Sequence, residues 1–279
     1  MAASGTSVQT VTLTPPSTEL SIVPGGNADN SFDVINSGDT TYNLSVSAAP
    51  YYVEGVNYDP QFTLLPGRTD ASQWVHITSS LNQTLASHKL VTISYTLRVP
   101  ASTAPGGYYA VLFAETNPAT TDNGVVIHNR VGDILYITVQ GPVRSGGSLQ
   151  GDSLPRVTTA ASLPLSLLVS NTGGAHFMTS ADLTVKNIYG KSVFHANLQR
   201  YVLPQTIRKI SAVWDSGSPI GLYRIERSAT VASAVHSLPE QWILVIQPWV
   251  LVLLGLLVVV FLANRIFKPM LKLKARKKS

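Results

Sequence analysis

The stretch Val91-Thr-Ile-Ser-Tyr-Thr-Leu-Arg-Val99 alternates apolar and polar residues without interruption. Because successive side chains of a β-strand point to opposite faces, its odd-numbered residues would share one face and its even-numbered residues the other. The apolar face would pack against a core, while the threonines, the serine and Arg98 would face solvent. The stretch therefore predicts a half-buried β-strand.

Similar patterns recur through the first 246 residues and are separated by turn-forming clusters. Alternating or β-rich runs occupy residues 42–46, 108–114, 134–139, 163–169, 181–185, 222–227 and 241–246. Glycine, proline and asparagine gather between them, as at Pro24-Gly-Gly26 and Asn123-Gly124. No stretch before residue 247 has the period of an amphipathic helix. Short strands between turns predict an all-β chain of sandwiches or barrels.

The polar segment 144–153, RSGGSLQGDS, is a predicted linker between two domains. It lacks an apolar period and follows the strong strand pattern at 134–139, as expected where few contacts cross a boundary. We therefore expect one β-domain over residues 8–143 and a second over 154–246.

Two short motifs occur in the same order in both predicted domains. The pattern V-x-N-[ST]-G occupies 34–38 and 169–173, and P-x-G-x-Y occupies 105–109 and 219–223. In the first motif we expect the asparagine to bond the local backbone and the glycine to adopt positive φ. In the second, we expect the tyrosine to begin a strand and point inward. The repeated order predicts two duplicated sandwiches.

A long apolar segment follows the second predicted domain. Residues 249–263, WVLVLLGLLVVVFLA, carry no charge, and the segment 248–267 contains twenty residues. At about 1.5 Å per residue, a helix of this length spans a bilayer's hydrocarbon core of about 30 Å. The segment predicts a transmembrane helix. We expect its interface anchors to be Trp242, Trp249, Arg265 and Lys268.

The positive charge of the chain is concentrated at its C-terminal end. Seven Lys and Arg residues lie between Arg265 and Lys278, whereas residues 1–264 carry 13 cations and 15 acids. The tail 268–279 is therefore expected in the cytoplasm and the two domains outside the cell membrane. Without a basic face on the domains, nucleic acid is not an expected partner. The chain has no cysteine, which excludes disulfide bonds and thiolate metal sites.

Several of these segments resemble a known group of bacterial surface proteins. Val23-Pro-Gly-Gly26 precedes Phe32-Asp-Val-Ile-Asn-Ser-Gly38, and Leu97-Arg-Val-Pro100 precedes Pro105-Gly-Gly-Tyr-Tyr109. This layout is similar to that of the WxL-interacting protein family, and residues 167–176 are similar to the adhesion-type sandwich that follows in such proteins. The resemblance implies two tandem immunoglobulin-like β-sandwiches followed by a single transmembrane α-helix.

The same resemblance implies a binding function without locating a site. In that family the first domain is associated with peptidoglycan and the second with surface-protein partners, and no cofactor or catalytic residue is implied. The expected partners here are thus cell-wall glycan or surface proteins, with the lipid bilayer around the helix. MAASGTSVQTVTL lacks the regions of a signal peptide, so we expect an export signal upstream. The alternative is a tail-anchored cytosolic adaptor that resembles proteins of the major-sperm-protein type.

The sequence gives little sign of catalysis or metal binding. The histidines are scattered, with no pair at a ligand spacing, at positions His76, His88, His128, His176, His195 and His236. No nucleophile elbow or phosphate-binding loop is present. An envelope hydrolase using Glu54, Asp59 and Asp70 is a second alternative, although acids beside turns commonly bond local backbone. We therefore expect a protein that is not an enzyme.

The candidate ligand contacts are tyrosines in the segment 50–62. Tyr51, Tyr52 and Tyr58 lie there among polar residues, a composition that stacks on sugar rings or anchors protein partners. The competing interpretation is that these rings fold onto the core. The polar loop 114–124 is a further candidate contact.

Overall fold

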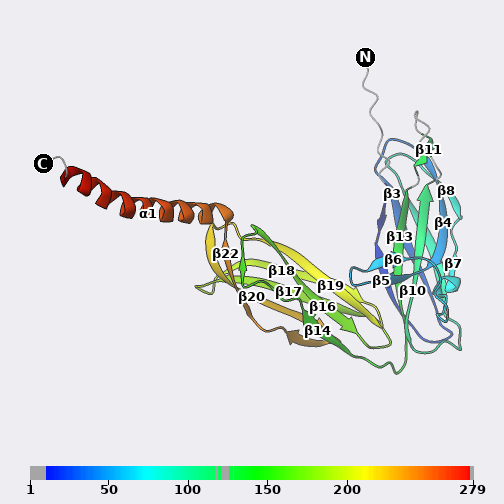
Figure 1. Cartoon of the computed structure of the whole chain (residues 1–279). Helices are drawn as coiled ribbons and strands as arrows, with labels where there is room; N and C mark the ends of the chain where they lie inside the picture. Colours follow the sequence, from blue (N-terminus) through cyan, green and yellow to red (C-terminus); the bar gives the residue numbers. More distant parts are fainter. Residues whose placement is uncertain (1–10, 117–118, 121–125, 128, 277–279) are drawn as a thin grey trace, which may run out of the picture. The chain divides into compact units, whose positions relative to one another are not determined.

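The computed structural model describes residues 11–116, 119–120, 126–127 and 129–276 (Figure 1). The chain forms two compact units, each described here by itself. The first comprises Met1–Gly147 together with Ser170–Phe177 and Tyr201–Arg208, and the second comprises Ser148–Val169, Met178–Arg200 and Lys209–Ser279. The predicted fold class is confirmed, because the described chain is built from β-strands and ends in one apolar helix.

The first unit contains a four-stranded and a five-stranded sheet. The four-stranded sheet has the order β1 (Val11–Thr14), β3 (Asn27–Asn36), β9 (Leu90–Arg98) and β7 (Val75–Ile77). The five-stranded sheet has the order β2 (Ser17–Ile22), β13 (Arg130–Val139), β10 (Gly106–Thr116), β4 (Tyr42–Pro50) and β8 (Asn82–Leu85). The first unit also contains two short two-stranded ribbons and one 3-10 helix. The ribbons pair β5 (Tyr52–Glu54) with β6 (Asp59–Gln61) and β11 (Ala119–Thr120) with β12 (Val126–Ile127), and the 3-10 helix is η1 (Ala71–Trp74).

The core of this unit lies between the two sheets, as the alternation at 91–99 predicts. Thr96 departs from the expected solvent face, because it is buried and its hydroxyl donates to Asp29 Oδ1. Ile93, Tyr95 and Leu97 of β9 are fully buried and share one apolar cluster with residues of β3, β4, β10 and β13. Strand β9 pairs with β3 in an antiparallel register that sets Phe32 opposite Ile93. Inward-facing side chains of both sheets thus form the interior of a β-sandwich.

The second unit also contains two sheets. The smaller has the order β14 (Gly147–Gly151), β16 (Ser162–Asn171) and β19 (Thr206–Asp215). The larger has the order β15 (Val157–Thr158), β22 (Gln241–Ile246), β20 (Ile220–Val231), β17 (Phe177–Asn187) and β18 (Ser192–Val202), with β21 (Ala234–Ser237) also paired to β20. Trp214 and Tyr223 are buried and meet edge-on with ring centroids 4.7 Å apart, one from each sheet. Part of the predicted linker 144–153 is therefore strand, because β14 pairs with β16.

The apolar C-terminal segment forms the helix α1 (Pro248–Arg276). It begins at the predicted residue but continues through most of the predicted tail 268–279, whose Leu, Lys, Met and Arg residues have high helix propensity. One helix, over Pro248–Arg265, is long and apolar enough to cross a membrane, and none of that span is buried against the protein.

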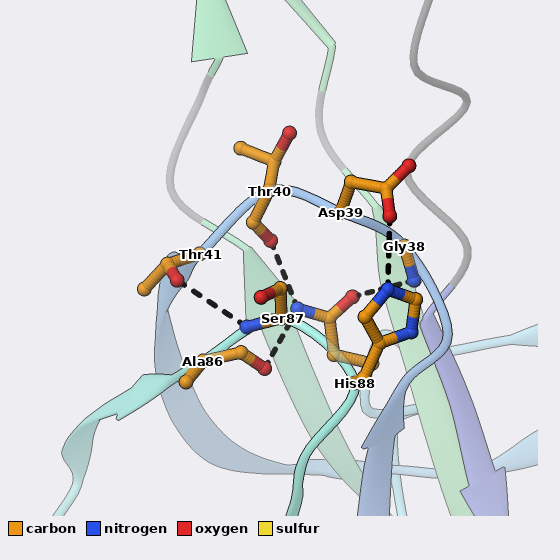
Figure 2. Close-up of polar contacts among 8 residues, drawn as sticks. Gly38, Asp39, Thr40, Thr41, Ala86, Ser87 and His88 are labelled. Carbon is orange, nitrogen blue, oxygen red and sulfur yellow. Dashed lines mark hydrogen bonds and ion pairs between the residues drawn. The ribbon is translucent and has the colours of Figure 1, made fainter.

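The repeated asparagine motif makes the same hydrogen bonds at both sites. Asn36 Oδ1 accepts from the Gly38 N–H at 2.9 Å, and its Nδ2 donates to the carbonyls of Thr40 and Ala86 at 2.9 and 3.0 Å. Around it, the Ser87 N–H donates to Thr41 Oγ1 and the His88 ring contacts Asp39 (Figure 2). The two connections that meet at Asn36, residues 37–41 and 86–89, are therefore held together by one buried side chain and by these two exposed contacts.

Asn171, two residues before Gly173, makes the same set of hydrogen bonds as Asn36. Its Oδ1 accepts from the Gly173 N–H at 2.8 Å, and its Nδ2 donates to the carbonyls of Ala175 and Val202 at 2.9 and 2.8 Å. The expectation of positive φ was wrong for both motif glycines. Glycine is needed at position 173 because no side chain fits there: a Cβ would lie 2.8 Å from the Arg144 carbonyl oxygen.

Both tyrosines of the second motif are buried, but only Tyr223 points toward the facing sheet as predicted, where it meets Trp214; Tyr109 lies on the outer face of its sheet. Each ring requires the glycine two residues before it. A Cβ at Gly221 would lie 2.6 Å from the ring of Tyr223, and one at Gly107 would collide with the Tyr109 hydroxyl. Residues i and i+2 of a strand share a face, so the glycine leaves room for the ring. The same glycine requirement therefore occurs in both motifs, although the two rings pack in different surroundings.

Substitution Asn36→Ala should lower the free energy of unfolding by about 3 kcal/mol, because three hydrogen bonds of about 1 kcal/mol each are lost. Asn171→Ala should have an effect of similar size. Thermal and urea unfolding measure both. Asn43→Ala is the control, since the exposed Asn43 side chain only accepts one bond from Thr84. Equal stability of Asn36→Ala and Asn43→Ala would contradict this account.

A buried carboxylate makes the first unit sensitive to pH. Asp133 is fully buried, and its two oxygens lie 3.0 and 3.2 Å from the Thr18 hydroxyl. Burial raises the pKa of Asp133 to about 6, and the Thr18 hydrogen bond only partly opposes this shift. Because the folded-state pKa exceeds the unfolded value of 3.8, the protonated form is favoured by folding. The stability that the protonated Asp133 contributes is therefore complete below pH 3.8 and is lost as the pH rises through about 6.

Asp133→Asn should therefore stabilise the protein at pH 7 by about 1–3 kcal/mol relative to wild type. The difference should shrink as pH falls and vanish near pH 4, where the wild-type carboxyl is also neutral. Urea unfolding of both proteins from pH 4 to 8 measures it. A stability difference that does not change with pH would show that Asp133 titrates normally.

Candidate binding site

The five-stranded sheet of the first unit is covered on both faces. Ala110, Leu112 and Ala114 of β10 face the main core, whereas the intervening residues belong to a separate cluster on the opposite face. The buried members of this outer cluster are Tyr51, Val53, Tyr58, Tyr109, Val111, Phe113, Tyr136 and Leu203. Strand β10 is consequently buried along nearly its whole length, as in sheets with two covered faces.

The three tyrosines predicted to contact a ligand lie in different surroundings in the structure. Tyr51 and Tyr58 are buried in the outer cluster, as in the competing interpretation that these rings fold onto the protein. Tyr52 is half-buried on β5, and its hydroxyl donates to Glu54 Oε1 at 3.3 Å. A direct ligand contact therefore remains a prediction for Tyr52 and for the edge of Tyr51. The loop candidate 114–124 lies partly outside the described residues, which exclude 117–118 and 121–125.

Tyr58 is fixed by a chain of hydrogen bonds within the first unit. Its hydroxyl accepts from the Leu203 N–H at 2.8 Å and contacts the Thr206 hydroxyl, which donates to the Leu203 carbonyl at 2.7 Å. The Arg208 guanidinium lies over the ring, 4.2 Å from its centroid. Tyr58 adopts φ of +65°, a backbone conformation that bulky residues rarely take. The ring therefore anchors the segment 201–208 to the β5–β6 ribbon.

A second polar contact within the outer face centres on His176. Its ring is buried among Tyr109, Tyr136 and Tyr201, with centroid separations of 5.5, 5.2 and 5.5 Å. Nδ1 lies 3.2 Å from the Tyr109 hydroxyl, and Nε2 lies 3.6 Å from Glu19 Oε1. Burial lowers the pKa of His176, and the Glu19 carboxylate only partly opposes this, so the ring is neutral at pH 7. A neutral imidazole suits a packing role here.

A small cavity of about 240 Å³ opens beside this cluster. Its wall is made by Tyr51, Arg68, Thr69, Gly107, Tyr108, Tyr109, Gly174, Pro204 and Gln205. Arg68 is exposed, and among the described residues no carboxylate forms an ion pair with it. Aromatic surfaces beside an unpaired guanidinium suit a ligand that carries both a flat apolar face and a carboxylate.

The alternative of a carboxylate-based hydrolase gains no geometric support. Asp70 caps η1, accepting from the Ser72 N–H at 3.0 Å and from the Gln73 amide at 3.2 Å. Glu54 and Asp59 are exposed and pair with each other across the β5–β6 ribbon. Among the residues that the structure describes, no group of three or more acids and histidines is placed to hold a metal ion.

The predicted membrane anchors are distributed over two elements. Trp242 lies in β22, opposite Arg224, with 47% of its surface exposed. Trp249 lies in the first turn of α1, where its Nε1–H donates to Gln247 Oε1 at 2.9 Å. Arg265 is exposed on α1. Lys268 belongs to the same helix, in the part whose side chains lie outside the description.

Sequence reasoning predicted Tyr51, which lines the cavity, but missed the other residues that surround the cavity and the histidine. Arg68, Tyr109, His176 and Tyr201 come from four separate segments, and only the fold brings them into one unit. Of these four residues, only Tyr109 carried a sequence signal, as the tyrosine of P-x-G-x-Y, and it lies on the outer face of its sheet.

Comparison with protein-family models gives no match, and neither does comparison with curated proteins. Solved structures with a similar fold include the class 5 fimbriae chaperone CfaA, with 8% identity and a TM-score of 0.41 over 85% of this chain and 99% of that one. The E. coli chaperone DraB has 12% identity and a TM-score of 0.40 over 84% of this chain and 97% of that one. A Salmonella enterica SafA pilin in complex with the SafB chaperone has 13% identity and a TM-score of 0.40 over 84% of this chain and 96% of that one. These similarities concern the β-sandwich fold alone.

Replacing Tyr58 by Phe should destabilise the protein by about 1–3 kcal/mol, because the buried Leu203 N–H loses its acceptor. Tyr52→Phe is the matched control, since it removes only an exposed hydrogen bond and should change stability by less than about 0.5 kcal/mol. Urea unfolding compares the two variants. If they unfold at the same urea concentration, the hydroxyl of Tyr58 does not hold the segment 201–208.

Proposed function

We propose that this protein is a single-pass membrane protein that displays two β-sandwich units outside the cell and binds cell-wall material or a partner surface protein. The observation that carries the proposal is α1. Its span Pro248–Arg265 has a mean hydropathy of 2.1, and none of that span is buried within the protein. A helix that is apolar on all sides and packs against nothing is stable when lipid surrounds it.

The orientation follows from charge. Seven cations and no acid lie between Arg265 and Lys278, and such excess positive charge favours the cytoplasmic side of a membrane. The sandwiches would then lie outside the cell. The tail-anchored alternative of the major-sperm-protein type would place this basic segment on the opposite side, which the same rule disfavours.

The cavity beside the outer cluster supports a ligand of the cell-wall class. Peptidoglycan combines sugar rings with peptide carboxylates, and the cavity combines the rings of Tyr51 and Tyr108 with Arg68, which has no carboxylate partner among the described residues. The resemblance to the WxL-interacting protein family points to the same ligand for the first domain. A surface protein that presents a carboxylate beside an aromatic or apolar group is the second candidate partner.

Protease treatment of intact cells tests the topology. We expect added protease to remove both sandwiches and to spare an epitope placed after Lys278. Permeabilised cells, in which the epitope should also be degraded, provide the control. Protected sandwiches in intact cells would overturn the extracellular placement.

Binding of the detergent-solubilised chain to purified peptidoglycan tests the ligand. Arg68→Ala should weaken binding roughly tenfold, since a charge-assisted hydrogen bond contributes about 1.5–3 kcal/mol. Arg98→Ala is the matched control, because Arg98 is an exposed arginine on β9 of the other sheet. Equal loss in both variants would indicate nonspecific charge attraction. Wild-type binding to a surface-protein fraction alone would identify the second candidate partner.

A further inference from the structure

An unusual number of apolar side chains are exposed at the end of the second unit where α1 begins. We call this set the apolar rim. It consists of Ile188, Tyr189, Val193, Ile220, Leu222 and Trp249, each at least 42% exposed. Isolated exposed apolar residues are normal, but a contiguous group marks a contact surface.

The strand register gathers these residues at one end. Asn187 pairs with Tyr223 across β17 and β20, so the turn that follows Asn187 lies level with residues 220–222. Ile220 in turn pairs with Ile246, two residues before Pro248 starts α1. The Gln247 N–H donates to the Pro219 carbonyl at 2.8 Å, which fixes the start of the helix to this end.

The tip of the β17–β18 hairpin is held in a defined conformation. Asn187 Oδ1 accepts from the N–H groups of Tyr189 and Lys191, both at 3.0 Å, and the Gly190 N–H donates to the Asn187 carbonyl at 2.9 Å. Ile188 and Tyr189 nevertheless project away from the core, with 56% and 86% of their surfaces exposed. Such a turn presents two apolar side chains without burying either.

We infer that the apolar rim rests in the interfacial layer of the bilayer that α1 crosses, so that the second unit docks on the membrane. This inference depends on the proposed membrane anchor. The rim is covalently continuous with α1, and its chemistry fits the layer: aromatic rings such as Tyr189 and Trp249 belong at the interface, and the neighbouring Lys191 can reach lipid phosphates. A small cavity between Ile188, Val193 and Leu222 gives an acyl chain room to enter.

Because the chain has no cysteine, single introduced cysteines can carry an environment-sensitive dye at chosen positions. The full chain is reconstituted in vesicles of phosphatidylcholine and phosphatidylglycerol that contain nitroxide-labelled lipid. Ser192→Cys reports on the rim, since Ser192 follows Lys191 at the start of β18. Ser237→Cys is the matched control, because Ser237 pairs with Ser228, eight residues from Ile220 along β20. At about 3.3 Å per residue, that pair lies roughly 26 Å from the rim. Val258→Cys reports on α1.

Lipids with a headgroup nitroxide should quench the Ser192 label several-fold more than the Ser237 label. The double substitution Ile188→Ser and Tyr189→Ser should reduce quenching at Ser192 to the level at Ser237. Lipids with a deep nitroxide should quench the Val258 label in both backgrounds.

Each of the other outcomes would contradict either the docking of the rim or the membrane anchor. Equal quenching at Ser192 and Ser237 with a deep Val258 label would overturn the docking and leave the anchor intact. Quenching at Ser192 that survives the double substitution would show that the rim does not make the contact. A blue-shifted Ser192 label without quenching would mean that protein, such as a second copy, covers the rim. An unquenched Val258 label would overturn the anchor, and the docking with it.

Discussion

The first unit depends on the burial of β10 on both of its faces. A chain without cysteine and with 13% charged residues must be held by apolar packing, and a two-layer sandwich buries only one face of each sheet. Here the five-stranded sheet acts as a middle layer, with the main core on one side and the outer cluster on the other. The β5–β6 ribbon and the segment 201–208 must therefore fold over Tyr109, Val111 and Phe113. The cavity lined by Arg68 lies at the edge of that covering, where packing ends.

Local sequence patterns predicted the parts of this architecture that local physics determines. The alternation of apolar and polar residues predicted β9, because the apolar residues of a strand mark the face that is buried. Asn36 and Asn171 were assigned correctly because an asparagine that ends a strand bonds a backbone a few residues away. The start of α1 was predicted because the continuous apolar segment begins there.

The misjudged features depend on contacts between residues that are distant in sequence. The segment 144–153 has the composition of a linker, but β16 provides a partner for β14. For Tyr51 and Tyr58 the sequence left open whether the rings contact a ligand or fold onto the protein, and burial of the rings depends on the distant residues Leu203 and Arg208. His176 and Arg68 gave no local signal, since a lone histidine and a lone arginine after a turn are common. Only assembly of the fold identifies the wall of the cavity.

The size of the cavity constrains what kind of recognition it can support. At about 240 Å³ it is smaller than the roughly 300–1,000 Å³ of sites that enclose a whole small molecule. It can hold one group of a larger ligand, such as a sugar edge or a peptide carboxylate beside Arg68. A single contact of this kind gives weak affinity, because the loss of translational freedom offsets most of it. Tethering changes this balance, since a protein confined beside a repetitive polymer meets many copies of the same group at high effective concentration. Under the proposed function, a shallow site on a tethered sandwich would therefore be enough for stable attachment to a wall, whereas the same site on a freely diffusing protein would not be.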